Sequence, residues 1–198
     1  MTATCMTRKK IARLVRDTAG FSYEFLRHPK GIGSLVPSSR GLARAMYRTA
    51  EKFGHPDAIV IEAGAGTGAI TRELVNHYPV ERLIINEANP RLVHRLGEKF
   101  GGSDIRAGFV EQLDIWQEEG PKIIISSLPF RSLPPKIAFG IRNVFADVLR
   151  GNPANILIQF TYGQKAPILR MPADIHASRV AHAWRNIPPA HVWLYRAH

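Results

Sequence analysis

A glycine-rich turn between an apolar segment and a helical pattern restricts the possible folds of this chain more than any other feature. In IVIEAGAGTGAITREL (residues 59–74), β-branched residues lead to Glu62, glycines follow at Gly64, Gly66 and Gly68, and helix-forming residues come next. Glycine lets the backbone take positive φ and approach a ligand closely. A strand-to-helix turn of this kind binds a dinucleotide, a phosphate or S-adenosylmethionine, so the rest of the sequence has to decide between hydride, phosphate and methyl transfer.

The rest of the chain alternates between apolar segments and amphipathic segments. Alternating strand and helix units predict a parallel, doubly wound sheet with its ligand at the carboxyl ends of the strands. The last two strand-like segments have no helix between them, so we expect an antiparallel hairpin. We predict strands at residues 58–64, 82–87, 104–108, 122–130, 154–162, 176–185 and 190–198, and helices at residues 7–27, 40–53, 69–78, 90–100 and 134–149.

The fold class that follows is α/β, with five parallel strands and a C-terminal antiparallel hairpin strand. This combination separates a Rossmann-like class I methyltransferase sheet from an ordinary dinucleotide-binding sheet. A chain of 198 residues is long enough for one domain with a full core. We therefore expect a single domain over residues 1–198, with a basic N-terminal segment over 1–54 and a catalytic α/β core over 55–198.

The charge of the chain predicts an anionic partner. The formal net charge is +11, and the first 50 residues hold ten Lys and Arg against two acids, a net of +8. The remaining residues hold 17 Lys and Arg against 14 acids, a net of +3. Such a basic segment attracts nucleic acid or an anionic membrane surface. The sequence shows no apolar run of about 18 residues and no secretory signal, and its single cysteine, Cys5, fits a reducing cytoplasm.

Features at the first two strand ends favour a sulfonium nucleoside over a dinucleotide or a triphosphate. The spacing Gly64-x-Gly66-x-Gly68 is tighter than the G-x-G-x-x-G of dinucleotide sites, and no Lys followed by Ser or Thr comes after Gly68, which excludes a P-loop. Glu62 would repel a phosphate but suits a cationic amino group such as that of methionine. Glu87 ends the next strand about 20 residues later, where an acid accepts hydrogen bonds from ribose hydroxyls. Together these features predict S-adenosylmethionine as the cofactor.

The end of the third predicted strand is the expected place of the contact with adenine. The sequence there is AGFVEQL, with Phe109 where methyltransferases usually carry an acid. The adenine can stack on Phe109 or Val110 and bond to the backbone, or Glu111 can substitute for the acid. The alternative is that the aromatic ring belongs to the core. The predicted cofactor site comprises Glu62, Ala63, Gly64, Ala65, Gly66, Gly68, Glu87, Ala88, Asn89, Gly108, Phe109, Val110, Ser126 and Leu128.

Several blocks of sequence resemble one enzyme family over nearly the whole chain. The blocks are FLRHPKGIGSLVPSSRGLARAM (25–46), EAGAGTGAITREL (62–74), SSLPF (126–130), QFTYG (159–163) and WRNIPPAHVWLY (184–195). They resemble the bacterial phospholipid N-methyltransferases, relatives of the rRNA adenine dimethyltransferases; the first and last blocks are the most specific. The resemblance implies that S-adenosylmethionine methylates the amine of phosphatidylethanolamine, in up to three rounds to phosphatidylcholine. It also implies a basic amphipathic N-terminal helix that binds anionic lipid and covers the active site.

Two features weigh a phospholipid against an adenine substrate. Adenine N6-methyltransferases place Asn or Asp before a Leu/Ile-Pro-aromatic triplet, where this chain has Ser127, a shorter and weaker acceptor. The helix predicted over 7–27 has a basic face opposite an apolar one, which suits a membrane interface. A nucleic-acid adenine methyltransferase remains the nearest alternative, before a small-molecule amine methyltransferase and a non-catalytic lipid-binding module. We therefore expect a monomeric cytoplasmic enzyme, peripheral on the inner face of the membrane, without nucleic acid or metal as a partner.

The acceptor amine has to lose a proton before it attacks the methyl group, because it is mostly protonated at neutral pH. The candidate proton acceptors or amine-orienting groups are Tyr23, Tyr162 and, ranked lower, His28. The remaining candidates are Ser127 as a catalytic group, Pro129 and Phe130 as walls of the methyl-transfer chamber, and Lys30 and Arg40 as ligands of the lipid phosphate.

Overall fold

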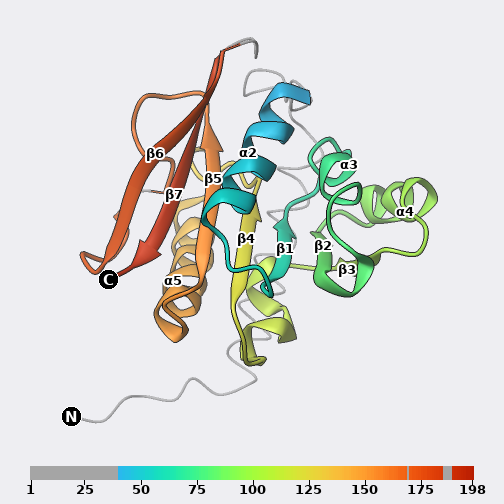
Figure 1. Cartoon of the computed structure of the whole chain (residues 1–198), viewed down its shortest axis with the longest axis horizontal. Coiled ribbons are helices and arrows are strands. Elements are labelled where there is room, and N and C mark those ends of the chain that lie inside the picture. Colours follow the sequence, from blue (N-terminus) through green and yellow to red (C-terminus); the bar gives the residue numbers. More distant parts are fainter. Residues whose placement is uncertain (1–39, 169, 185–188) are drawn as a thin grey trace. The chain divides into compact units, whose positions relative to one another are not determined.

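A seven-stranded sheet organises the protein (Figure 1). The computed structural model describes residues 40–168, 170–184 and 189–198. The strands lie in the order β3-β2-β1-β4-β5-β7-β6. Their bounds are β1 Ile59–Ala63, β2 Leu83–Glu87, β3 Asp104–Ala107, β4 Lys122–Ser126, β5 Ile156–Thr161, β6 Ile175–Ala183 and β7 Ala190–Ala197.

The directions of the strands confirm the prediction of five parallel strands with an antiparallel hairpin. Strand β1 pairs in parallel with β2 and β4, β2 pairs in parallel with β3, and β4 pairs in parallel with β5. Strand β7 runs antiparallel between β5 and β6, with His182 opposite His191. The register of β6 shifts between Arg179 and Ala181. A bulge of this kind twists an edge strand away from further pairing.

Helices cover both faces of the sheet, because neighbouring residues of a strand point to opposite faces. On one face, Leu42 and Met46 of helix α2 are buried in one apolar cluster with Ile125 of β4. On the other face, Phe145 of helix α5 is buried in a second cluster with Ile124 of the same strand. Strands buried on both faces read as continuous apolar runs, as this sequence does. The carboxyl ends of β1, β4 and β5 meet at one edge of the sheet, the upper edge in Figure 1.

The helices begin and end close to the predicted residues, with one exception. The helix predicted over 69–78 is reduced to a single turn and is followed by further turns. Pro79 disfavours a helical conformation at Tyr78, and the ring of His77 stacks on that of Tyr47 with centroids 3.9 Å apart. The helices are α2 Arg40–Phe53, α3 Thr71–Leu74, α4 Pro90–Lys99 and α5 Pro135–Gly151, with short 3₁₀ segments η2 Val80–Arg82, η3 Val110–Gln112 and η4 Asp114–Gln117.

Helix α2 belongs to the same compact unit as the sheet. The helix predicted over 7–27 lies outside the described residues, so the single domain over 1–198 and the helical cover of the site stay predictions. Within the described ranges, no helix has both the length and the apolar character needed to cross a membrane.

Candidate active site

The glycine-rich turn after β1 has the conformation that its sequence predicts. Gly64, Gly66 and Gly68 have φ of +77°, +59° and +81°, a region that side chains disfavour. A Cβ on Gly64 would lie 2.7 Å from Leu128 Cδ2, and one on Gly68 would lie 2.6 Å from the ring of Phe100. A Cβ on Gly66 would meet nothing within 4 Å. Two of the glycines are therefore required by packing, whereas the middle one borders open space that a ligand can fill.

Glu87 at the carboxyl end of β2 is bound to this turn. Its Oε2 accepts a hydrogen bond of 2.8 Å from the Gly66 backbone N–H, and its Oε1 accepts one of 2.8 Å from the Asn89 N–H. Each carboxylate oxygen has a second lone pair that can accept another donor. The carboxylate is thus fixed beside the open space at Gly66, with acceptor capacity left for ribose hydroxyls.

Asn86 holds the ends of β2 and β3 together. Its buried Nδ2 donates to the carbonyls of Arg106 at 3.1 Å and Gly108 at 3.0 Å. Gly108 has φ of +118° and open space where a Cβ would lie. Next to it, Phe109 is half-buried and Val110 is buried. The candidate adenine contact is therefore a fixed backbone corner that faces free space on one side.

Glu111, the alternative adenine ligand, lies in η3, directly after Phe109 and Val110. Its Oε2 is buried without a hydrogen-bond partner among the described residues, and burial raises its pKa. It borders a groove that extends to Lys122 and Asn155, at the amino ends of β4 and β5. The structure thus places Glu111 beside that groove, which leads to the opposite edge of the sheet from the glycine turn.

Glu62 in β1 is fully buried, and only one of its two carboxylate oxygens has a hydrogen-bond partner among the described residues. Its Oε2 accepts a hydrogen bond of 2.7 Å from Thr71 Oγ1, and its Oε1 has no partner among the described residues. Burial raises the pKa of Glu62 to about 7, the Thr71 bonds oppose this, and Glu87 adds a smaller increase. A cation nearby would stabilise the charged carboxylate. The unpaired oxygen therefore fits the ammonium group of a methionine-derived cofactor.

The loop after β4 packs against the glycine turn. The Ser127 N–H donates to the Ala63 carbonyl at 2.9 Å, and the buried Ser126 Oγ accepts from the Leu128 N–H at 3.3 Å. Gln159 of β5 adds a bond of 3.1 Å from its Nε2 to the Leu128 carbonyl. Ser127 and Leu128 are consequently held next to the glycine turn, and Pro129 follows them in the chain.

The ring of Phe130 is buried in the apolar cluster under α5, with its centroid 6.2 Å from that of Phe145. Ala63, which directly precedes the glycine turn, and Val110 belong to the same cluster, and Leu128 packs against it. The role of Phe130 as a wall of the methyl-transfer chamber stays a prediction.

Tyr162 lies just past the end of β5 with 40% of its surface exposed. It borders a cavity of about 610 Å³ that β6 and β7 close on the other side. Arg40 is exposed at the first residue of α2. The other sequence candidates for proton transfer and lipid binding, Tyr23, His28 and Lys30, lie outside the described residues.

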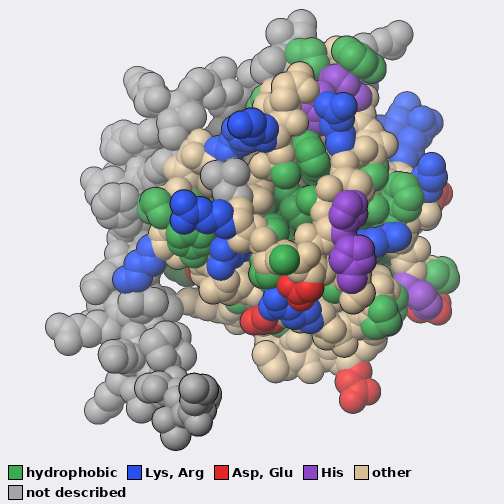
Figure 2. Space-filling model, turned by 90° about the vertical axis from the view of Figure 1, so that its left-hand side faces the viewer, with side chains coloured by type: hydrophobic (Ala, Val, Ile, Leu, Met, Phe, Trp, Pro, Cys, Tyr) green, Lys and Arg blue, Asp and Glu red, His purple; other side chains and the backbone are tan. Residues whose placement is uncertain are grey.

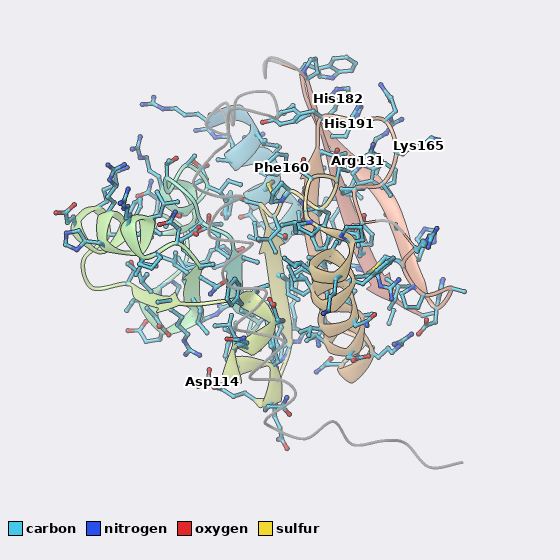
Figure 3. The ribbon with its side chains drawn as sticks, turned by 180° about the vertical axis from the view of Figure 1, so that it is seen from behind. Asp114, Arg131, Phe160, Lys165, His182 and His191 are labelled. Atoms are coloured by element: carbon cyan, nitrogen blue, oxygen red, sulfur yellow. The ribbon has the colours of Figure 1, made fainter. Side chains whose placement is uncertain are left out.

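The cavity beside Tyr162 brings together residues that sequence reasoning missed. Arg179, His182 and His191 line it, and His182 pairs directly with His191 across the hairpin. Figure 3 shows both histidines at the same end of the molecule as Arg131 and Lys165. The hairpin register could have indicated the histidine pair, but only if the length of the turn had been known.

Comparison with known proteins shows which family the chain belongs to. A scan of family models gives no match. The ornithine lipid N-methyltransferase of Singulisphaera acidiphila is 32% identical over 143 residues, which cover 68% of this chain and 73% of that enzyme. The chain belongs to the family of this enzyme.

Solved structures agree on the fold. The N-methyltransferase NodS of Bradyrhizobium japonicum WM9, in complex with S-adenosyl-L-homocysteine, has a TM-score of 0.59 at 15% identity and covers 89% of this chain and 98% of its own. A SAM-dependent methyltransferase from Anabaena variabilis has a TM-score of 0.62 at 13% identity, with coverages of 91% and 95%. The expected class I methyltransferase fold is confirmed. One of these neighbours holds S-adenosyl-L-homocysteine, the product form of the cofactor that the sequence predicts.

The residues of this methyltransferase fit that cofactor. The unpaired Glu62 oxygen, the open space at Gly66 and the fixed Glu87 carboxylate offer sites for an ammonium group, a close backbone approach and a ribose. Among the described residues, no cluster of three or more His, Cys, Asp or Glu side chains could hold a metal ion.

Proposed function

We propose that this enzyme methylates the amine of phosphatidylethanolamine, stepwise towards phosphatidylcholine, at the surface of a membrane. The observation that carries the proposal is the family relationship to an enzyme named for N-methylation of a lipid. The charge distribution supports it, because a net of +8 in the first 50 residues favours an anionic lipid surface. The enzyme would act as a peripheral protein on the inner face of the membrane.

The chemistry requires the protein mainly to position two molecules. The bound cofactor supplies an electrophilic methyl group on its sulfonium. The ammonium group of the lipid would first give up a proton to water, and its lone pair would then attack the methyl carbon in line, with S-adenosylhomocysteine as the leaving group. A methylated ammonium forms as the bond from carbon to sulfur breaks. The corner at Ser127 and Pro129 lies beside the glycine turn, so the amine would approach there, with the exposed Tyr162 as a candidate to orient it.

Ornithine lipid is a second candidate, because it is the substrate in the name of the relative. Its side-chain amine offers the same nucleophile to the same methyl donor. A nucleic-acid adenine is less well supported, because Ser127 has one hydroxyl where an amide or carboxylate oxygen would hold the exocyclic amine.

Transfer of radiolabelled methyl groups tests the acceptor. The enzyme would be given labelled S-adenosylmethionine with vesicles that contain phosphatidylethanolamine, with vesicles that contain ornithine lipid, or with ribosomal RNA. We expect label in the phosphatidylethanolamine vesicles at the highest kcat/KM. Label in the ornithine lipid alone would replace the proposed substrate by the second candidate, and label in RNA alone would overturn lipid methylation.

Binding to vesicles without turnover tests the membrane location. We expect the enzyme to bind vesicles of anionic lipid and to dissociate as the salt concentration rises, because several Lys and Arg each contribute about 1 kcal/mol near such a surface. Equal binding to zwitterionic vesicles at every salt concentration would contradict the electrostatic part of the proposal.

A further inference from the structure

The cavity at the end of the β6–β7 hairpin opens at the same edge of the sheet as the cofactor site. Its walls come from three segments: the chain after β5, the second half of β6 and the start of β7. Its volume is about 610 Å³. Figure 2 shows Lys and Arg side chains over the upper and middle parts of the face that carries β6, histidines at its top and again near its middle, and acidic side chains in its lower half. The residues that line the cavity are Tyr162, Gln164, Arg179, Val180, Ala181, His182, Trp184, Pro189 and His191.

Two imidazoles in this cavity have buried nitrogen atoms without partners. His191 is only 3% exposed, and its Nδ1 has no hydrogen-bond partner among the described residues. The Nε2 of His182 is buried and unpaired as well, and the two ring centroids are 4.1 Å apart. Trp184 stacks on the other side of His182 at 3.7 Å, which fixes the orientation of that ring. Buried polar atoms are nearly always bonded, so two unpaired ring nitrogens in residues that line a cavity lack partners that a ligand would supply once the rings turn toward it.

The charges around the cavity favour an anionic ligand. Arg179 lines the cavity, and its Nη1 donates to Gln164 Oε1 at 3.2 Å. No Asp or Glu occurs among the described lining residues. Burial, then His182 and Arg179, lower the pKa of His191, so its environment already disfavours another positive charge. An anion would relieve this repulsion and accept N–H bonds from the histidines and the guanidinium.

Two further cations lie close to the mouth of the cavity. The Nη2 of Arg131 donates to the Lys165 carbonyl at 3.1 Å, which ties the loop after β4 to the loop after β5. The same guanidinium lies against Gly163, next to Tyr162 of the cavity wall. Figure 3 shows Arg131 and Lys165 at the end of the molecule where His182 and His191 lie. These charges would attract an anionic group toward the cavity from solvent.

We infer that this cavity binds the anionic group of the aminolipid acceptor, a phosphate or a carboxylate, through Arg179, His182 and His191. The inference rests on the proposed function and names the part of the site that recognises the headgroup. Strand β7 lies two strands from β4, a distance of about 10 Å between backbones. A headgroup held in the cavity can therefore extend its amine toward the corner at Ser127, beside the cofactor. Phosphatidylethanolamine would supply a phosphate, and ornithine lipid would supply a carboxylate.

The first experiment measures headgroup binding by calorimetry, apart from catalysis. The full chain loaded with S-adenosylhomocysteine is titrated with glycerophosphoethanolamine or with Nα-acetylornithine, which separate the two anion sources. The test variant is Arg179→Gln, and the control is Arg95→Gln, which removes an exposed charge from α4 at the other side of the sheet. We expect one of the two probes to bind. Its affinity should fall about tenfold or more in Arg179→Gln and stay unchanged in Arg95→Gln.

The second experiment follows the histidines. Bound anion should raise the pKa of the His191 imidazole and shift the NMR signals of both histidines, and His191→Phe should weaken binding without changing the affinity for S-adenosylhomocysteine. Equal affinities of Arg179→Gln and Arg95→Gln, or histidine signals unaffected by the probe, would overturn the inference.

The same variants in the methyl-transfer assay separate the two proposals. We expect Arg179→Gln to raise KM for the lipid about tenfold while kcat changes less. An enzyme that methylates lipid with equal KM in both arginine variants, and that binds neither probe, would keep its proposed function and lose this anion site. An enzyme that binds a probe through Arg179 but methylates neither lipid would keep the anion site and lose the proposed function.

Discussion

The two halves of the carboxyl edge of the sheet differ in how completely their polar groups are hydrogen-bonded. At the ends of β1, β2 and β3, Glu87 accepts two backbone hydrogen bonds and Asn86 donates two, so the corner is largely fixed before any ligand binds. At the ends of β5, β7 and β6, polar atoms of His182, His191 and Trp193 are buried without partners among the described residues.

The difference follows from what each half has to recognise. A cofactor shared by many enzymes can be met by a backbone corner that is organised in advance, which lowers the entropy cost of binding. If the other half binds the acceptor as proposed above, its unpaired polar atoms would receive their partners with the substrate. Glu62 is the exception in the cofactor half, since one of its oxygens also awaits a partner. The comparison can be tested at four points, taken from the largest expected effect to the smallest.

The largest effect is expected at the open space beside the glycine turn. Gly66→Val should weaken S-adenosylhomocysteine binding by at least about 100-fold, equivalent to about 3 kcal/mol, because the side chain would occupy free space that the ligand needs. Both substitutions introduce a side chain at positive φ, but Gly68→Val should reduce the free energy of unfolding more, because its side chain would also collide with Phe100. Calorimetric titration and urea unfolding of both variants separate these outcomes. Unchanged binding in Gly66→Val would place the cofactor elsewhere.

The next effect is the pH dependence of stability that arises from Glu62, whose carboxylate has one unpaired oxygen. Its pKa is raised from 4.5 to about 7 by burial, so the folded state holds its proton more tightly than the unfolded state. Stability should therefore fall as pH rises from about 4.5 through 7, by up to about 3 kcal/mol. Glu62→Gln should lack this decrease. The measurement is urea unfolding of both proteins between pH 5 and pH 8 without cofactor, and parallel pH profiles would contradict the assignment.

A moderate effect is expected where the cofactor half is fully bonded. Asn86→Ala removes both amide bonds to the β3 end and leaves the two carbonyls without these donors, which should cost about 1–3 kcal/mol of unfolding free energy. Asn143→Ala is the control, because Asn143 is exposed on α5. Thermal or urea unfolding compares the two. Equal stability of the two variants would show that the hydrogen bonds of Asn86 do not fix the ends of β2 and β3.

The smallest effect is expected in the open half, at Trp193. Its buried indole N–H has no partner among the described residues, whereas the N–H of Trp116 donates to the Val110 carbonyl at 2.6 Å. Trp193→Phe should change the free energy of unfolding by less than about 1 kcal/mol, and Trp116→Phe should cost about 1–3 kcal/mol. The two rings are both half-buried, which makes the pair well matched. A larger loss at Trp193 would show that its N–H is satisfied in the folded protein.

The sequence predicted the cofactor half well because that half is local. The glycine turn follows β1 directly, and Glu87 ends the next strand, so strand ends and spacing suffice to bring them together. The exceptions within this half are long-range effects. The helix predicted over 69–78 shortens where Tyr47 of another helix stacks on His77, and the burial of Phe130 depends on Phe145 of the distant helix α5.

The acceptor half could not be predicted in the same way. His182 and His191 meet only because β7 inserts between β5 and β6 with a particular register, and a shift of one residue would send both side chains to the other face. Arg179 reaches the same cavity from a strand whose pairing is interrupted by a bulge. No spacing in the sequence specifies these choices, since they depend on how the hairpin packs against the rest of the sheet.

The sequence by itself determined a parallel sheet with a methyltransferase hairpin and a glycine turn with two acids for the cofactor, because each of these depends on short-range backbone geometry. Only the tertiary structure decided which polar atoms remain without partners and where they face. A hydrogen bond between distant segments exists only when the packing of the whole sheet has fixed both partners, and that packing is what left Glu62, His182 and His191 open.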